Sequence, residues 1–510
     1  MQRSARFIGP ALRTGLSALL LATAGCTGAH EGSATGSADP PTADQVPVAD
    51  LRADFDALYA GLRDAHFDLY ARRDRDAYEA RYRAMRAGFD HPLTPLQARI
   101  AFQRFVAYGN VAHARIDPPL AEWERFRTGG GKAFPLFVRV QGGQAWIIDG
   151  TRGLDAVEPG DRLLSVDGVP ALAWLERLRV HLSADNDYMA WAQLERQLPL
   201  LAWLEFGERP MFQIEVAKPD DRRISLALPA RARGEPVTTH TAGVPARFEL
   251  DANTREARML ADGIAYLRPG PFYDNRPQAT HPWDPTDFRG FLDAAFADML
   301  ARGATRLLID LRDNPGGDNS FSDPMIAWFA DRPFRFSNAF EIRVSDATIH
   351  SNRRRLDAQG AGDPDSTSHR LADAYAGQAP GSVVRFPIPM FAPRSAPRFE
   401  GDVYVLVNRH TYSNATLVAA IVQDFGFGRV LGEETSDLAS TYGAMESFTL
   451  PRTGLEVGYP KARILRPNGD PVARGVVPDL AIATPVSSDT DVVLQEAIEL
   501  IRQRPGPSMP

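Results

Sequence analysis

A serine between a predicted strand and a predicted helix is the residue of this sequence best placed for covalent chemistry. The apolar, β-branched run Val403–Val407 predicts a buried strand, and Ala415–Val422 predicts a helix. Ser413 lies between them, on a sharp turn that would present its hydroxyl outward beside the first helical N–H groups. This geometry suits a nucleophile with an anion-stabilising pocket. The alternative is that Ser413 only caps the helix.

Other residue types limit the chemistry. The three lysines are Lys132, Lys218 and Lys461, and the last is predicted to be a surface charge. The histidines show no HExxH or paired spacing, so we expect no metal site. No phosphate-binding glycine loop occurs, and no cofactor is expected. Cys26 is the only cysteine, which excludes an internal disulfide and a thiol nucleophile elsewhere in the chain.

The N-terminus has the features of an export signal. A basic segment precedes the short apolar run Leu16–Ala22, and residues 1–25 are predicted to be a signal peptide. The residues before Cys26 resemble a bacterial lipobox, so lipidation of Cys26 is expected; plain secretion with cleavage near Ala24 is the alternative. Residues 26–46 predict a flexible linker. We therefore expect a cell-envelope protein held at the membrane only by its lipid.

The remaining chain predicts several domains. A chain of 510 residues is too long for a single hydrophobic core. Its net charge of −7 argues against nucleic-acid binding. We expect a helical domain at 47–125, a core at 250–485 and a closing helix within 486–504, capped by Ser487 or Ser488. Strand–helix alternation favours an α/β core. The polar segment Ser345–Pro380 is expected to cross the surface.

A β-rich segment interrupts this order. Leu154–Gly168 contains a Pro-Gly turn, a short strand and an Asp-Gly hairpin turn, and closely resembles the core signature of PDZ domains. Flanking strands are predicted within Phe134–Ile148, at Phe212–Val216 and at Ile224–Leu228. We therefore expect a PDZ-like domain at 133–232, with an unusual insertion at Asp185–Arg209.

Three motifs in order define a family resemblance. They are IDLRDNPGG at 309–317, the stretch around Ser413 at 411–435, and GVVPDL at 475–480. Together they resemble the C-terminal-processing, or tail-specific, serine peptidases and their tricorn-like relatives. The resemblance implies a ClpP/crotonase-like ββα core and an acyl-enzyme mechanism without metal or cofactor.

Motif matching carries the family's roles onto this chain. Ser413 takes the nucleophile position, and the backbone N–H groups of Gly316, Gly317 and Asn414 would form the oxyanion hole. One branch of the family uses a lysine base at a position that falls near Leu438, but no lysine follows Ser413 before position 461. The tricorn-like branch uses a histidine from the N-terminal part, and His113 matches it as general base.

The acid that would orient the histidine is not identified. The tricorn-like branch has a glutamate at the position of Val472, so Asp470, Glu433 and Glu434 remain candidates by sequence proximity. His410 is a rival base because it is close to Ser413 in sequence, and His113 could be an ordinary loop residue.

The combined hypothesis is a lipid-anchored envelope endopeptidase that acts on polypeptides. The alternative is a catalytically weakened peptide-binding or scaffold protein of the same architecture. A crotonase-type acyl-CoA enzyme is excluded by location, because an exported protein meets little CoA.

Overall fold

The computed structural model describes residues 45–151, 154, 156–234, 253–279, 281–359, 366–488 and 490–503. The predicted signal peptide, Cys26 and nearly all of the predicted linker lie outside these residues. Within the described ranges, no helix is both long and apolar enough to cross a membrane.

A six-stranded, mostly parallel sheet forms the centre of the C-terminal half, and its strands are ordered β16-β13-β12-β9-β8-β7. Neighbours are parallel except β7, which runs antiparallel to β8. The sheet contains β7 (Glu256–Met259), β8 (Ile264–Arg268), β9 (Arg306–Asp310), β12 (Asp402–Val407), β13 (Arg429–Gly432) and β16 (Leu480–Ala481). Continuous apolar runs make up the inner strands because both faces of the sheet are covered.

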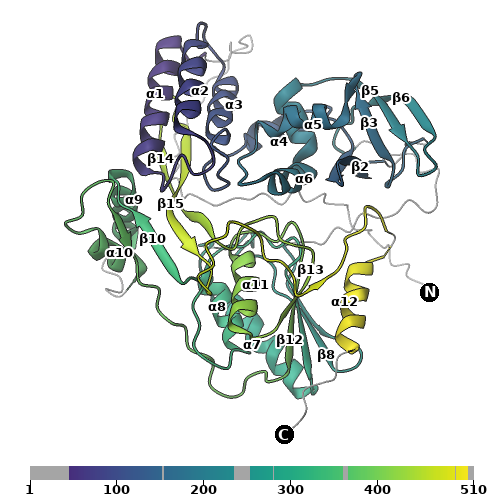
Figure 1. Ribbon diagram of the computed structural model, residues 1–510, viewed down its shortest axis with the longest axis vertical. Coiled ribbons are helices and arrows are strands. Elements are labelled where there is room, and N and C mark those ends of the chain that lie inside the picture. Colours follow the sequence, from purple (N-terminus) through teal and green to yellow (C-terminus); the bar gives the residue numbers. More distant parts are fainter. Residues whose placement is uncertain are drawn as a thin grey trace, which may run out of the picture.

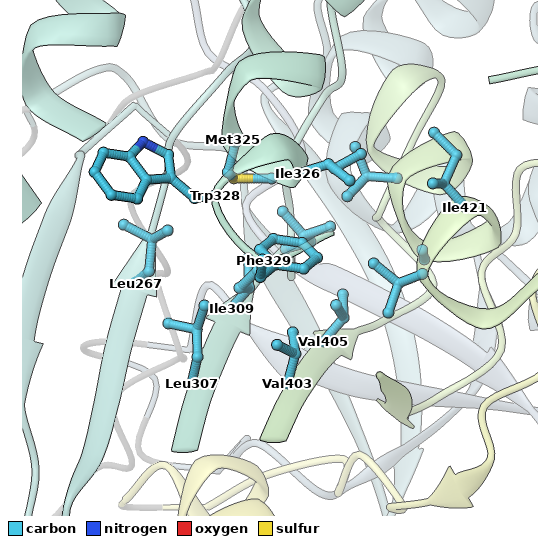
Figure 2. Close-up of a cluster of buried hydrophobic side chains, with 14 of the residues drawn as sticks. Leu267, Leu307, Ile309, Met325, Ile326, Trp328, Phe329, Val403, Val405 and Ile421 are labelled. Atoms are coloured by element: carbon cyan, nitrogen blue, oxygen red, sulfur yellow. The ribbon is translucent and has the colours of Figure 1, made fainter. Parts of the chain in front are cut away.

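Helices cover both faces of this sheet. α7 (Thr286–Ala301), α8 (Asn319–Ala327) and α11 (Asn414–Phe425) pack on one face, and α12 (Val492–Arg502) packs on the other (Figure 1). Figure 2 shows strand residues such as Leu307 and Val405 facing the α8 side chain Ile326 and the α11 side chain Ile421. The predicted α/β core is therefore confirmed.

A second, antiparallel sheet rises from the core toward the N-terminal helices (Figure 1). Its strands are ordered β11-β10-β15-β14, and it contains β10 (Ala339–Arg343), β11 (Val383–Arg385), β14 (Thr441–Thr449) and β15 (Glu456–Leu465). Side chains of the β14–β15 hairpin share one hydrophobic cluster with α1 (Val48–Ala65) and α3 (Pro95–Ala107). α2 (Arg75–Ala87) completes the predicted helical region. This packing holds the loop that follows α3 against the β14–β15 hairpin.

The β-rich segment forms a third sheet, in which β1 (Phe137–Gln141), β2 (Gln144–Asp149), β3 (Arg162–Val166), β5 (Met211–Ala217) and β6 (Arg223–Pro229) follow one another. β4 (Val169–Pro170) pairs with β3 across a turn at Asp167 and Gly168, both with positive φ, as the Asp-Gly pair predicts. α4 (Leu120–Thr128) precedes this sheet, and α5 (Ala171–Arg179) packs on it. The expected insertion is mostly one helix, α6 (Asp187–Phe206).

Within the polar segment expected to cross the surface, the described residues form two packed helices, α9 (Asp346–Gln359) and α10 (Thr367–Tyr375), with Leu371 and Tyr375 buried. Two local predictions are wrong. Lys461 is 6% exposed rather than a surface charge, since its Nζ binds Glu446 Oε1 at 2.6 Å. The cap of α12 is Asp491, whose Oδ1 accepts the Leu494 N–H.

Candidate active site

Ser413 lies on a strained turn at the carboxyl end of β12, the strand between β9 and β13. Its φ of 53° and ψ of −124° are close to those of the first central residue of a type II′ turn, a position that favours glycine. Ser413 precedes α11, but its side chain makes no capping hydrogen bond to that helix. The capping alternative is therefore wrong, and the hydroxyl remains available for other chemistry.

The loop after β9 holds this turn in place. Tyr412 N–H donates to the Asn314 carbonyl at 3.0 Å, and Thr411 Oγ1 donates to the Leu311 carbonyl at 2.8 Å. Because β9 and β12 are adjacent parallel strands, their following loops meet at one edge of the sheet. The sequence motifs around Gly316 and Ser413 are thus neighbours in space.

Gly316 packs directly against the Ser413 turn. A Cβ at Gly316 would lie 2.5 Å from the Tyr412 carbonyl oxygen and 2.8 Å from the Ser413 Cβ, and φ at Gly316 is 85°. The Gly316 N–H, however, donates to Asn314 Oδ1 at 2.9 Å. This corrects the prediction for Gly316, because an N–H that is already bonded cannot serve as an oxyanion donor. Because it lacks a side chain, Gly316 instead allows the loop after β9 to pack closely against the Ser413 turn.

The backbone N–H groups of Gly317 and Asn414 stay predicted oxyanion donors. Gly317 has a φ of 141°, and a Cβ there would lie 2.1 Å from the Phe272 carbonyl oxygen. Asn414 is the first residue of α11, where a helix leaves its N–H without an intrahelical partner. The Asn414 side chain donates to Ser322 Oγ at 2.8 Å and fixes the start of the helix.

His113 lies in the loop after α3 and is brought to the Ser413 turn by the β14–β15 hairpin. Arg115, two residues later, pairs with Gly458 of β15 through two backbone hydrogen bonds. The His113 ring stacks on the ring of Tyr412, with centroids 5.8 Å apart. The structure therefore brings His113 beside the residue that precedes Ser413, although His113 and Ser413 are 300 positions apart in sequence.

The environment of His113 favours the neutral ring. The residue is 7% exposed, and its Nδ1 has no hydrogen-bond partner among the described residues. Burial, together with the positive charge of Arg115, lowers the pKa of His113 to about 4, while a hydrogen bond with the backbone of Tyr442 opposes this shift. At neutral pH the imidazole is consequently uncharged and has a free nitrogen.

His410, the rival base, is committed elsewhere. Its Nε2 lies 3.3 Å from Oε1 of Glu195, a residue of α6 that is 2% exposed. Arg139 Nη2 binds the same carboxylate at 2.8 Å, and Arg409 approaches it at 3.6 Å. Burial would raise the pKa of Glu195, but its contacts with Arg139, His410 and Arg409 hold that pKa well below its usual value. This cluster joins α6 to the loop that carries Ser413.

None of the three acids suggested by sequence proximity contacts His113 in the described part of the chain. Glu433 binds Arg409, and Asp470 Oδ1 accepts the Val472 N–H at 3.0 Å. The backbone carbonyl of Glu434 accepts a hydrogen bond from the Tyr188 hydroxyl. These predictions are wrong, since Glu433 and Asp470 bind other groups and no contact joins Glu434 to His113 in the described ranges.

Two acids that the sequence motifs do not indicate lie at the site. Asp437 Oδ2 accepts the Ser413 N–H, and Asp185 Oδ2 accepts the Ala112 N–H at 3.1 Å, next to His113. Asp437 is 24 residues after Ser413, close to the position where a lysine was sought. This spacing from Ser413 is the feature of the sequence that could have indicated Asp437. No local pattern marks Asp185, which lies just before α6.

Comparison with known proteins agrees with this architecture. Residues 264–482 match the family described as peptidase family S41. The structure of mature CPAF superposes with a TM-score of 0.62 at 14% identity, covering 89% of this chain and 97% of that one. The structure of mature CPAF complexed with lactacystin gives 0.61 at 15% identity, covering 89% and 98%. Residues 264–482 are therefore a peptidase family S41 domain, which makes this part of the chain a serine peptidase of the C-terminal-processing type.

Proposed function

We propose that this chain is an endopeptidase that cleaves polypeptides through an acyl-enzyme at Ser413, with His113 as general base. The observation that carries the proposal is the strained turn at Ser413. Its hydroxyl is not used to cap α11, and the neutral His113 ring stacks on the preceding residue. Strain of this kind costs about 1–3 kcal/mol and is retained where function requires it.

The proposed reaction follows from these groups. As Ser413 Oγ bonds to the scissile carbonyl carbon, its proton passes to Nδ1 of His113. The N–H groups of Gly317 and Asn414 stabilise the oxyanion. His113 then gives the proton to the leaving amine as the C–N bond breaks, and water hydrolyses the resulting ester by the same route.

Casein hydrolysis by matched variants tests this assignment. Ser413→Ala and His113→Ala should each lower kcat/KM by at least ~1000-fold, as removal of a nucleophile or its base does in comparable enzymes. His410→Gln keeps a donor toward Glu195 and should retain most activity. Full activity in either alanine variant would refute the mechanism, whereas loss in His410→Gln alone would favour the rival base. A folded wild-type protein without hydrolysis would favour the scaffold alternative.

We also propose that the chain is a lipid-anchored protein of the bacterial cell envelope. The support is the export signal at residues 1–25 followed by Cys26. Radiolabelled palmitate should be incorporated into the wild-type protein and not into a Cys26→Ser variant. Equal labelling of both would contradict lipidation at this residue.

A further inference from the structure

Two buried carboxyl groups flank the Ser413–His113 pair from different elements. Asp437 follows β13 and is 1% exposed; Asp185 precedes α6 and is 8% exposed. Asp437 accepts the backbone N–H of Ser413, and Asp185 accepts the N–H of the residue before His113. Each acid therefore fixes the backbone of one partner of the proposed catalytic pair.

A small apolar cluster holds the two acids in the same region. Leu438, next to Asp437, packs with Ala184, which precedes Asp185, and with Ala112, which precedes His113. The three loops that carry Asp437, Asp185 and His113 are thus joined by side-chain contact. Water is largely excluded there, which strengthens electrostatic interactions between the charged groups.

Each of the three titratable groups keeps an atom without a hydrogen bond. Within the described ranges, these atoms are Oδ1 of Asp437, Oδ1 of Asp185 and Nδ1 of His113. Asp185 Oδ1 makes only an ion contact of 3.5 Å with Arg72 Nε. A buried polar atom that lacks a hydrogen bond is destabilising and is uncommon in folded proteins. Three such atoms beside a reactive serine indicate a role in the reaction.

The reaction itself creates a need for negative charge here. When His113 takes the serine proton, a buried imidazolium forms next to Arg115, an unfavourable position for a cation. Val472, which stands where the family resemblance expects a glutamate, is 53% exposed and apolar. The counter-charge must therefore come from another carboxylate.

We propose that Asp437 is the acidic positioning residue of this site. Its carboxylate holds the Ser413 backbone and supplies the negative charge that stabilises the His113 imidazolium. This inference rests on the proposed function of Ser413 and His113. It assigns to Asp437 the counter-charge that the acid of the catalytic triad supplies in other serine peptidases.

The charges around Asp437 determine the expected pH dependence. Burial raises the pKa of Asp437 to about 7, the N–H groups of Ser413 and Leu438 oppose this shift, and the negative charge of Asp185 adds to it. Tyr412, His113, Arg115 and Arg72 are the other titratable or charged groups of the surrounding loops. His113, with a pKa of about 4, is already neutral across this range. A rise in reactivity near pH 7 would thus belong to Asp437.

The test measures the rate at which a fluorophosphonate modifies Ser413, and kcat and KM for a peptide, from about pH 5 to about pH 9. The wild-type rate should rise through about pH 7. Asp437→Asn keeps an oxygen for the Ser413 N–H but cannot ionise, so the rise should disappear and kcat should fall ~10–100-fold with little change in KM. Asp185→Asn removes a like charge, so the rise should move to lower pH.

Asp470→Asn is the matched control, because this acid contacts neither Ser413 nor His113 in the described structure and should leave the profile unchanged. Thermal unfolding establishes that each variant is folded. An unaltered rise near pH 7 in folded Asp437→Asn, or no acid shift in folded Asp185→Asn, would overturn this inference alone. Failure of wild-type Ser413 to react at any pH would instead overturn the proposed function.

Discussion

Replacement of Gly316 by alanine should lower the activity of the site while leaving the fold intact. The new Cβ would lie 2.5 Å from the Tyr412 carbonyl oxygen and 2.7 Å from the Asn414 nitrogen, whereas real Cβ contacts essentially never fall below 3.0 Å. The Ser413 turn must therefore move by about 0.5 Å, the difference between these limits. Both Ser413 Oγ and the oxyanion donor at Asn414 would be displaced together.

The expected size of the effect follows from this displacement. A misplacement of about 1 Å in a catalytic group can cost ~100-fold in rate, so a loss of ~10–100-fold in kcat/KM is expected, or ~1.4–2.7 kcal/mol. Alanine at a positive φ adds a folding cost of about 1 kcal/mol. Peptide hydrolysis and urea unfolding measure the two quantities separately.

Gly303 provides the matched control for Gly316. Its φ is 70°, close to the 85° of Gly316, but a Cβ there would meet no atom within 4 Å. Gly303→Ala should therefore lose about the same stability, ~1 kcal/mol, and retain its activity. If Gly316→Ala hydrolyses peptide as fast as Gly303→Ala, the contact between Gly316 and the Ser413 turn has no catalytic role and the reasoning fails.

Three further predictions concern stability. Ser413→Gly should be inactive but more stable to urea than Ser413→Ala by about 1 kcal/mol, since glycine favours φ 53° and ψ −124°; equal stability would argue against strain. Glu195→Gln leaves Arg139 buried without its counter-charge and should lower the free energy of unfolding by about 3–5 kcal/mol. Glu341→Gln, which removes a half-exposed ion pair with Arg463, should lower it by less than about 1 kcal/mol. Burial raises the pKa of Asp323 from 3.8 to about 7, so the free energy of unfolding should fall as pH rises from about 4 to about 7, where the unfolded chain is ionised at this residue and the folded one is not; Asp323→Asn should flatten that decline in pH-dependent unfolding.

The sequence predicted the parts of the fold that depend on local patterns. The apolar run at Val403–Val407 is a buried strand, and Ser413 follows it at a strand-to-helix turn as predicted. The strands at 133–232 were likewise marked by their turns, among them the Asp-Gly pair. Such features are encoded within a few residues, and local chain geometry is sufficient to produce them.

The remainder depends on contacts between distant segments. Lys461 looked like a surface charge because its partner Glu446 comes from the neighbouring strand, which a single strand pattern does not reveal. Asp185 and Asp437 lie 252 positions apart, and only the packing of α6 against the core brings them to one site. The commitment of the Gly316 N–H to Asn314 is also a detail of side-chain geometry, which motif matching cannot supply.

The most direct measurement is the mass-spectrometric position and rate of fluorophosphonate modification. Trypsin releases residues 410–429 as one peptide, and Ser413 is its only serine. We predict a stoichiometric adduct on Ser413 in the wild-type protein and a rate at least ~100-fold lower in His113→Ala. An adduct elsewhere in the chain, or one that forms on Ser413 at the wild-type rate without His113, would contradict the proposed catalytic pair.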